Sequence, residues 1–303
     1  MIVVAGEALV DLIARPDGTI AAVSGGGPYN AARAIGRLGV PVAWTGCLSS
    51  DRFGRELEAG LTADGVALDL VQRTELPTTL ALAELDASGT ATYRFYTDGT
   101  SAPALTPLPG GLPAGTRAVH AGTLGLVLEP IATTLAALVA DLPDDVLLLV
   151  DPNCRPSIVR DAVTFRGRMT QVLARADVVK VSTDDLAFLR PGEATLDAVS
   201  WLTSLGPRAI IVTDGEGPVQ VVAGGAVHAV DVPRIEVVDT VGAGDTFGGA
   251  ALACLVHDGV TRATLDAGSA IRATRFGVRA AAIACTRAGA DPPTLAELGG
   301  WPA

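Results

Sequence analysis

Lysine is almost absent from this sequence: Lys180 is the only one among the 22 basic residues. That scarcity excludes two classes of phosphate-handling protein. A Walker A loop needs a glycine-rich turn directly before its lysine, and the surrounding "ADVVKVS" contains no glycine. A protein kinase needs H-R-D and D-F-G segments besides its lysine, and the sequence contains neither of them.

Histidine and cysteine are also scarce, with three and four residues that lie far apart in the chain. No CxxC pair or histidine cluster is present, so the sequence does not predict a zinc site. In a cytosolic protein, isolated cysteines are usually buried free thiols. We expect this of all four: Cys47, Cys154, Cys254 and Cys285.

Long apolar runs and basic runs are missing as well. No stretch reaches the length that crosses a bilayer. The opening "MIVVAGEALVDLIAR" lacks a basic region and a cleavage site, so we interpret it as a first strand and not as a signal peptide. A net charge of −11 disfavours nucleic acid and anionic membranes as partners. We therefore expect a cytoplasmic protein that binds small molecules.

The hydrophobic segments that are present predict an α/β fold. Several short apolar runs are typical of strands buried on both faces, as in a parallel sheet: "MIVVAG", "VAWTG", "AVHAG", "VLLLVD", "DVVKVS" and "AIIVTD". Helical patterns lie between them, such as "NAARAIGRLG", in which Gly39 is expected to end the helix in a left-handed conformation. The alternation predicts one domain, residues 1–303, with a doubly wound, mainly parallel sheet and helices on both faces.

One segment departs from this alternation. "TTLALAELDASGTATYRFYT", residues 78–97, has a two-residue period on either side of "DASG" and predicts a β-hairpin. Together with the earlier segment "DLIARPDGTIAAVSGG", residues 11–26, the hairpin predicts a small β lid formed by about 11–26 and 76–98. Such a lid would exclude water from a reaction. The alternative is a hairpin that extends the edge of the main sheet.

The segment "DTVGAGDTFGGA", residues 239–250, places a glycine turn between a strand and a helix. A dinucleotide-binding fingerprint has the same order, but the G-x-G-x-x-x-G spacing differs and the carboxylate of Asp245 would repel a pyrophosphate. In a phosphotransferase the same geometry is useful. The amides of Gly242, Ala243 and Gly244 would hold the phosphoryl group, while Asp245 would accept the proton of the attacking hydroxyl.

This segment resembles the D-T-x-G-A-G-D-x-F signature of the PfkB (ribokinase-like) carbohydrate kinases. The family's other signature, a Gly-Gly turn followed by an asparagine on a helix, is similar to "GGGPYNAARAIGRLG", residues 25–39. The resemblance covers essentially the whole chain. It implies a ribokinase-like fold and transfer of the γ-phosphoryl group of ATP to a primary hydroxyl of a free sugar.

The resemblance also implies roles for single residues. Positions that hold sugar hydroxyls in the family are matched by Asp11, Gly25, Gly26 and Asn30. "DPNCRPSIV" resembles a D-x-N-x-R element, whose arginine, here Arg155, would face the phosphates. The nucleotide would contact the turn after "IIVT", with Thr213 and Gly215 matched, together with Gly242 and Gly244.

Two metals are implied beside ATP. Mg²⁺ would be held through water by Asp185, where the family often has a glutamate. K⁺ is implied at Asp239 and the Val241 carbonyl, closed by a segment similar to "AAAIACTRAGADPP", residues 280–293.

The identity of the sugar depends on details of the lid. "GEALVDL", "GGGPYN", "YRFYTDGTSA" and "CTRAGA" resemble the fructokinase branch, so we expect fructose. Arg94 is a candidate substrate contact, because an inward Arg94 would favour an acid such as 2-keto-3-deoxygluconate, whereas inward Tyr93 and Phe95 would suit a neutral ketose. A regulator that binds sugar without catalysis is a third hypothesis. Lid edges often pair in this family, which implies a homodimer.

Overall fold

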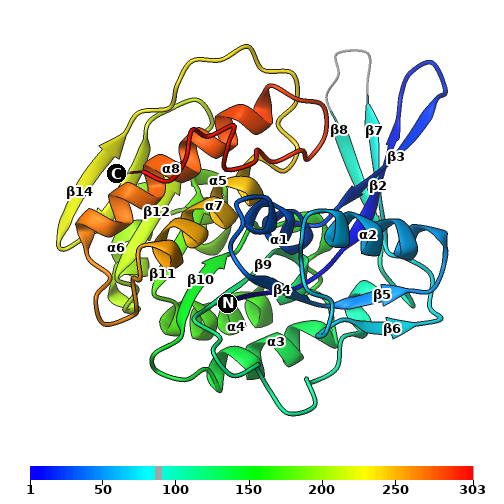
Figure 1. Ribbon diagram of the computed structural model, residues 1–303, viewed down its shortest axis with the longest axis horizontal. Helices are drawn as coiled ribbons and strands as arrows, with labels where there is room; N and C mark the ends of the chain where they lie inside the picture. The colour runs from blue at the N-terminus through cyan, green and yellow to red at the C-terminus, as the bar shows by residue number, and fades with distance from the viewer. Residues whose placement is uncertain (86–90, 303) are drawn as a thin grey trace.

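The computed structural model describes residues 1–85 and 91–302 and is built on an eight-stranded sheet in the order β14-β13-β12-β11-β10-β9-β1-β4. Neighbouring strands from β4 to β12 run parallel, and β13 and β14 are antiparallel (Figure 1). The strands are β1 (Ile2–Ala5), β4 (Val42–Thr45), β9 (Ala118–Gly122), β10 (Leu147–Asp151), β11 (Val178–Ser182), β12 (Ala209–Thr213), β13 (Val219–Ala223) and β14 (Ala226–Val230).

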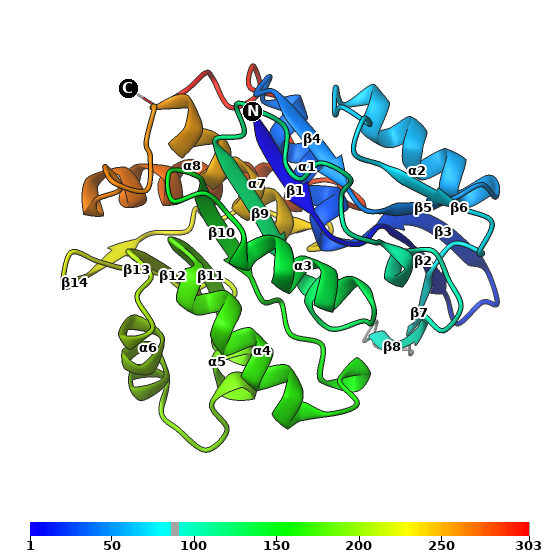
Figure 2. The ribbon, with the colours of Figure 1, turned by 90° about the horizontal axis from the view of Figure 1, so that it is seen from below.

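Helices cover both faces of this sheet, as the doubly wound prediction requires (Figure 2). Because successive strand residues point to opposite faces, Val178 and Val179 enter two separate apolar cores. One core includes side chains of α1 (Gly27–Arg37), α2 (Arg52–Ala63), α7 (Ala243–His257) and α8 (Ala267–Cys285). The other includes side chains of α3 (Ile131–Ala140), α4 (Ala162–Arg175), α5 (Thr183–Leu189) and α6 (Thr195–Ser204).

Helix α1 shows how local sequence sets these boundaries. The helix starts at Gly27, earlier than the "NAARAIGRLG" pattern suggests, because Pro28 fits the first helical turn, where no amide partner is needed. Gly26 precedes it with φ 106°, which a glycine adopts readily. Gly39 follows the helix with φ 76°, the left-handed conformation that the sequence predicts.

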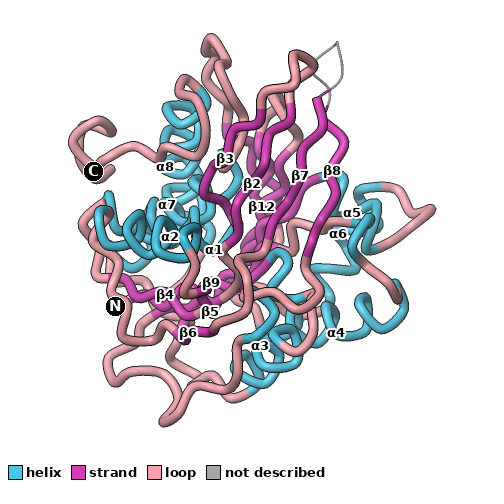
Figure 3. Tube along the Cα trace, turned by 90° about the vertical axis from the view of Figure 1, so that its right-hand side faces the viewer, coloured by secondary structure: helices cyan, strands magenta, loops and turns pink. Residues whose placement is uncertain are grey.

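The lid is a separate four-stranded sheet in the order β3-β2-β7-β8. Its strands are β2 (Leu9–Ala14), β3 (Ile20–Gly25), β7 (Leu80–Leu85) and β8 (Ala91–Tyr96). The predicted hairpin is the antiparallel pair β7 and β8, whose "DASG" turn lies outside the described residues. A parallel pairing of β2 with β7 joins the two predicted lid segments, 11–26 and 76–98, in one sheet (Figure 3). The alternative of an extension at the edge of the main sheet is therefore wrong.

Smaller elements complete the described chain: a two-stranded pair of β5 (Cys47–Ser49) and β6 (Gln72–Thr74), and the 3-10 turns η1 (Ala102–Ala104), η2 (Thr123–Leu126) and η3 (Pro156–Ile158). Across residues 1–85 and 91–302, no helix combines the length and the apolar character needed to cross a membrane.

The winding of the chain reverses at β1, which pairs with β4 on one side and with β9 on the other. In open α/β sheets such a reversal opens a crevice at the carboxyl ends of the strands, where ligands bind. Glu7 follows β1 and Thr123 follows β9, so both lie at this position. Thr123 has φ 52°, an unusual value for a residue with a side chain.

Candidate active site

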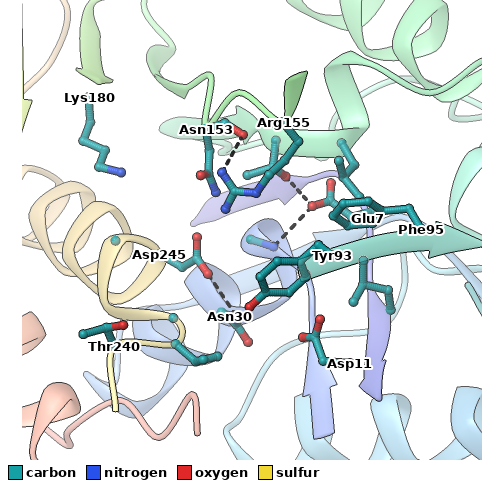
Figure 4. A pocket seen from close by; sticks show the side chains of 18 residues that line it. Glu7, Asp11, Asn30, Tyr93, Phe95, Asn153, Arg155, Lys180, Thr240 and Asp245 are labelled. Atoms are coloured by element: carbon teal, nitrogen blue, oxygen red, sulfur yellow. Dashed lines mark hydrogen bonds between the residues drawn. The ribbon is translucent and has the colours of Figure 1, made fainter. Parts of the chain in front are cut away.

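A cavity of about 300 Å³ opens between the carboxyl edge of the main sheet, the lid and the start of α7. Its polar and aromatic wall draws on segments that are far apart in the sequence (Figure 4). The labelled wall residues are Glu7, Asp11, Asn30, Tyr93, Phe95, Asn153, Arg155, Lys180, Thr240 and Asp245.

Asp245 lies in the first turn of α7, where the glycine turn places it. Gly242 precedes the helix with φ 72°, and a Cβ there would lie 2.6 Å from the Cβ of Ala290. The Asn30 Nδ2 group donates a hydrogen bond of 2.9 Å to Asp245 Oδ2. The two signature motifs therefore meet at this carboxylate.

The three residues of the glycine turn differ in their contacts. Gly242 and Gly244 line the cavity. The backbone N–H of Ala243 instead donates a hydrogen bond of 3.2 Å to the Thr240 carbonyl, and Ala243 is not part of the wall. This bond stabilises the turn itself, and the predicted contact of the Ala243 amide with the phosphoryl group stays a prediction.

The lid and the turn before α1 form the other end of the cavity. Asp11 projects into it from β2, and burial together with the charge of Asp245 raises the pKa of Asp11 to about 6, against the opposing charge of Arg155. Gly26 lines the wall, whereas Gly25 does not. A Cβ at Gly25 would lie 2.2 Å from Asp11 Oδ2, so this glycine makes room for the carboxylate, and its predicted contact with the sugar stays a prediction.

Strand β8 presents its aromatic side chains to the cavity. Tyr93 and Phe95 line the wall, and their rings stack with centroids 6.2 Å apart. Arg94 alternates to the opposite side, where its Nε lies 3.0 Å from Glu84 Oε2 on an exposed surface. The structure thus corrects the prediction that Arg94 contacts the substrate, since the strand period turns it away from Asp11 and Asp245.

Arg155 reaches the cavity from the loop that follows β10. Its Nη1 donates to the carbonyls of Asn153, at 3.3 Å, and Cys154, at 3.2 Å. These bonds fold the side chain back over its own loop, and the guanidinium remains on the wall. This location is compatible with the predicted contact to phosphates.

Asp185 does not line the cavity and lies behind the loop that carries Arg155. Its Oδ1 accepts from the Cys154 amide at 2.6 Å, and its Oδ2 accepts from the Ser182 amide and hydroxyl at 2.8 Å. Asp185 therefore caps α5 and fixes the loop that carries Arg155. The predicted contact of Asp185 with Mg²⁺ through a water molecule stays a prediction.

Asp239 ties the glycine turn to the C-terminal segment. Its Oδ1 accepts from the Val241 amide at 3.0 Å, and its Oδ2 accepts from the Gly289 amide at 2.8 Å. The carboxylate and the Val241 carbonyl are oxygen donors of the kind that hard cations prefer. Among the described residues, no three His, Cys, Asp or Glu side chains converge in a metal-binding group.

Thr213 and Gly215 lie further along the same edge of the sheet, at the end of β12. They are not part of the cavity wall. Strand β12 pairs directly with β11, which carries Lys180. The loop after Thr213 closes through a hydrogen bond of 2.8 Å from the Gly217 amide to the Asp214 carbonyl. The predicted nucleotide contacts therefore belong to an outer part of this edge.

Glu7 is a wall residue that the sequence analysis missed. Its carboxylate accepts from the amides of Gly27, at 3.2 Å, and Gly125, at 2.8 Å, and from the Thr123 hydroxyl. Burial raises the pKa of Glu7 to about 7, although these hydrogen bonds oppose the rise. A carboxylate directly after the first buried strand was a usable signal, because that position lies at the carboxyl edge of the sheet.

Lys180 is a second wall residue that the sequence analysis did not predict. There the lysine was used only as an argument against a P-loop. Its Nζ lies 2.9 Å from Asp151 Oδ2, and both side chains are buried. The signal was a single lysine inside the otherwise apolar strand "DVVKVS".

Comparison with known proteins identifies the family of the chain. Residues 1–297 match the pfkB family of carbohydrate kinases. The chain belongs to this family. We therefore interpret Asp245 and the glycine turn as parts of a pfkB-family carbohydrate kinase.

Several relatives of this chain are named fructokinases. A fructokinase from Rhizobium leguminosarum bv. trifolii is 35% identical over 266 residues, covering 85% of this chain and 80% of the relative. A fructokinase from Klebsiella pneumoniae is 31% identical over 266 residues, covering 85% of both. The crystal structure of a fructokinase from Xylella fastidiosa with bound ATP has a TM-score of 0.88 at 28% identity and covers 98% of this chain and 96% of that chain. These similarities confirm the predicted place near the fructokinase branch.

Proposed function

We propose that this pfkB-family kinase transfers the γ-phosphoryl group of ATP to a primary hydroxyl of free fructose. The observation that carries the proposal is the position of Asp245, which begins a helix beside a glycine turn and shares one cavity with Asp11. Similarity to fructokinases, one of them solved with bound ATP, supports both substrates.

Asp245 is the base of the proposed reaction. Its carboxylate accepts the proton of the sugar hydroxyl while that oxygen forms a bond to the γ-phosphorus and the bond from phosphorus to the bridging oxygen of ADP breaks. The hydrogen bond from Asn30 fixes the carboxylate in place. The N-terminal turn of α7, with Gly242 and Gly244 on the wall, stabilises the negative charge of the phosphoryl group.

The sugar end of the cavity suits a neutral ketose. The Asp11 carboxylate and the backbone around Gly26 can pair with hydroxyls, and Tyr93 and Phe95 provide apolar cover. With Arg94 turned outward to Glu84, the lid residues that the structure describes on the cavity wall include no cation for the carboxylate of 2-keto-3-deoxygluconate, which was the reason to consider that substrate.

The cations and the assembly are parts of the same proposal. Mg²⁺ would arrive with ATP and neutralise its phosphates, while Asp239 and the Val241 carbonyl would hold K⁺ beside the glycine turn. We also propose a cytoplasmic location, where ATP is present as the donor. Exposed apolar side chains on the lid, Ile20 and Tyr96, support a homodimer formed through it.

A coupled assay of ADP formation over a panel of sugars tests the function. We expect fructose to be turned over faster than 2-keto-3-deoxygluconate, fructose 6-phosphate and fructose 1-phosphate, and product analysis by NMR should find the phosphate on a primary carbon. A preference for a sugar acid or for a sugar phosphate would overturn the choice of fructose. Sugar binding without ADP formation would favour a regulator that does not catalyse.

A further inference from the structure

Lys180 approaches the catalytic turn from the sheet below it. On β11 its neighbours Val179 and Val181 point into the opposite core, so Lys180 points to the face that α7 covers. A Cβ at Gly244 would lie 3.0 Å from Lys180 Nζ, which places the ammonium directly beneath the first turn of α7. Figure 4 shows the side chain extending from the strand toward Asp245.

One neighbour holds this ammonium group. Asp151 Oδ2 accepts its hydrogen bond of 2.9 Å, from the adjacent strand β10. An ammonium carries three N–H donors, and in the part of the chain that the structure describes this is the one hydrogen bond of the Lys180 Nζ group. Burial opposes the charge of Lys180, but Asp151, Asp185 and Asp245 raise its pKa above the usual value. Two charged donors are therefore available to a ligand in the cavity.

The location is electrostatically unusual. Helix α7 spans 15 residues, and its N-terminal end carries a partial positive charge. A buried ammonium beneath the same turn repels that end, and the nearby carboxylates of Asp151 and Asp245 oppose this repulsion. Asp151 binds the ammonium from the sheet side, so the cavity side of Lys180 and the helix turn face the same space. An anion in that space would receive donors from both.

We propose that Lys180 is a further catalytic residue, which contacts the γ-phosphoryl group while Asp151 positions its ammonium. This inference rests on the proposed kinase function and deepens it. Lys180 stays protonated throughout: the proton of the sugar hydroxyl goes to Asp245, and the lysine stabilises charge as the phosphoryl group leaves ADP for the sugar oxygen. Its chemistry is that of a fixed donor and not of a base.

The decisive measurement compares ATP with ADP, because these ligands differ by the group that Lys180 should touch. Affinities of the wild type and of Lys180→Met are measured by calorimetry with magnesium and without sugar. We expect the variant to bind ATP at least about tenfold more weakly, with a change of less than about twofold for ADP. The kcat for fructose should fall by about a hundredfold or more.

A matched control separates contact from simple destabilisation. Val178 lies two residues earlier on the same strand and the same face, and it is buried. Val178→Ala should lower stability but keep the ratio of ATP to ADP affinity. If Lys180→Met does not fold, the double variant Lys180→Met with Asp151→Asn removes both buried charges and is measured in its place.

An unchanged ratio of ATP to ADP affinity in the lysine variant would overturn the inference, whatever happens to turnover. The proposed function fails separately: a wild-type protein that binds ATP but phosphorylates no sugar would refute it, and the affinity ratio would still decide the role of Lys180.

Discussion

Asn30 and Asp245 are separated by 215 positions in the chain, and a hydrogen bond of 2.9 Å joins Asn30 Nδ2 to Asp245 Oδ2. Asn30 comes from the first turns of α1 and Asp245 from the first turn of α7, and the two helices pack side by side in one core. The catalytic base of the proposed reaction is thus oriented by the other signature motif. Neither motif forms the site without the other.

The first prediction concerns the base. Asp245→Asn should keep the fold, because the new side chain has the same shape and its oxygen can still accept from Asn30. The kcat should fall by about a hundredfold or more, the usual effect of losing a positioned base. Steady-state kinetics with fructose and calorimetry with ATP check both parts.

Asp258, the residue that follows α7 at its other end, provides the control, since Asp258→Asn changes the same chemical group outside the cavity. It should leave kcat within about twofold of the wild type. A fully active Asp245→Asn enzyme would remove Asp245 from the reaction.

The second prediction concerns the two faces of β8. Arg94→Ala should change kcat/KM for fructose by less than about tenfold, because the exposed pair with Glu84 is lost and no ligand contact is lost. Phe95→Ala should have the larger effect, since it removes part of the cavity wall. If Arg94→Ala instead abolished a preference for 2-keto-3-deoxygluconate, the lid would serve a sugar acid.

The third prediction concerns the close approach at Gly27. A Cβ there would lie 2.4 Å from Thr123 Cγ2 and 3.0 Å from Asp245 Oδ1, so Gly27→Ala must displace one of them. We expect a loss of kcat of about tenfold or more, since small shifts of catalytic groups are costly. Kinetics and thermal unfolding of the purified variant measure the effect on activity and on stability.

Gly167 is the matched control for this substitution. It lies on the exposed side of α4, and a Cβ there would contact nothing within 4 Å. Gly167→Ala should raise the free energy of unfolding by about 0.5 to 1 kcal/mol, because alanine is favoured in a helix interior. Equal behaviour of the two variants would contradict the proposed crowding at Gly27.

The fourth prediction concerns pH. The pKa of Glu7 is about 7 in the folded protein, above its ordinary value of 4.5, so the folded state binds the proton more tightly. Its contribution to stability is full below the ordinary pKa and is lost as pH rises through about 7. From about pH 5 to about pH 8, the free energy of unfolding of the wild type should therefore fall by up to about 3 kcal/mol relative to that of Glu7→Gln.

Urea unfolding of both proteins across this range tests the prediction. Asp11 and Asp151 also have their pKa raised to about 6, chiefly by burial, with the same sign, and their effect is present in both proteins. The difference between the two curves isolates Glu7. Parallel curves would show that Glu7 does not titrate as its burial implies.

The sequence was sufficient for the fold class and for the core of the site. Strand and helix periods follow from which residues must be buried, so "DVVKVS" and "AIIVTD" identified β11 and β12. The glycine turn could be interpreted in the same local way. The left-handed conformation of Gly242 and the helix start that carries Asp245 are set by neighbouring residues.

Contacts between distant segments could not be obtained in this way. The two-residue period of β8 groups Tyr93 with Phe95 and separates them from Arg94, but it does not say which side faces the cavity. Only the pairing of β7 with β2 and the position of the lid over the main sheet decided that. The contacts of Asp185 could not be predicted from the sequence either, because its partner Cys154 belongs to the loop after another strand.

The sequence by itself determined the α/β architecture, the lid hairpin and the position of Asp245 at the start of α7, since each depends on the burial pattern or backbone geometry of one short segment. The tertiary structure alone decided that Arg94 turns away, that Asp185 caps a helix, and that Lys180 and Asp151 form a buried pair beneath Gly244. The reason is physical. A side chain's charge state and partners depend on the groups that packing brings to within a few ångströms, and those groups come from strands and loops far away in the chain.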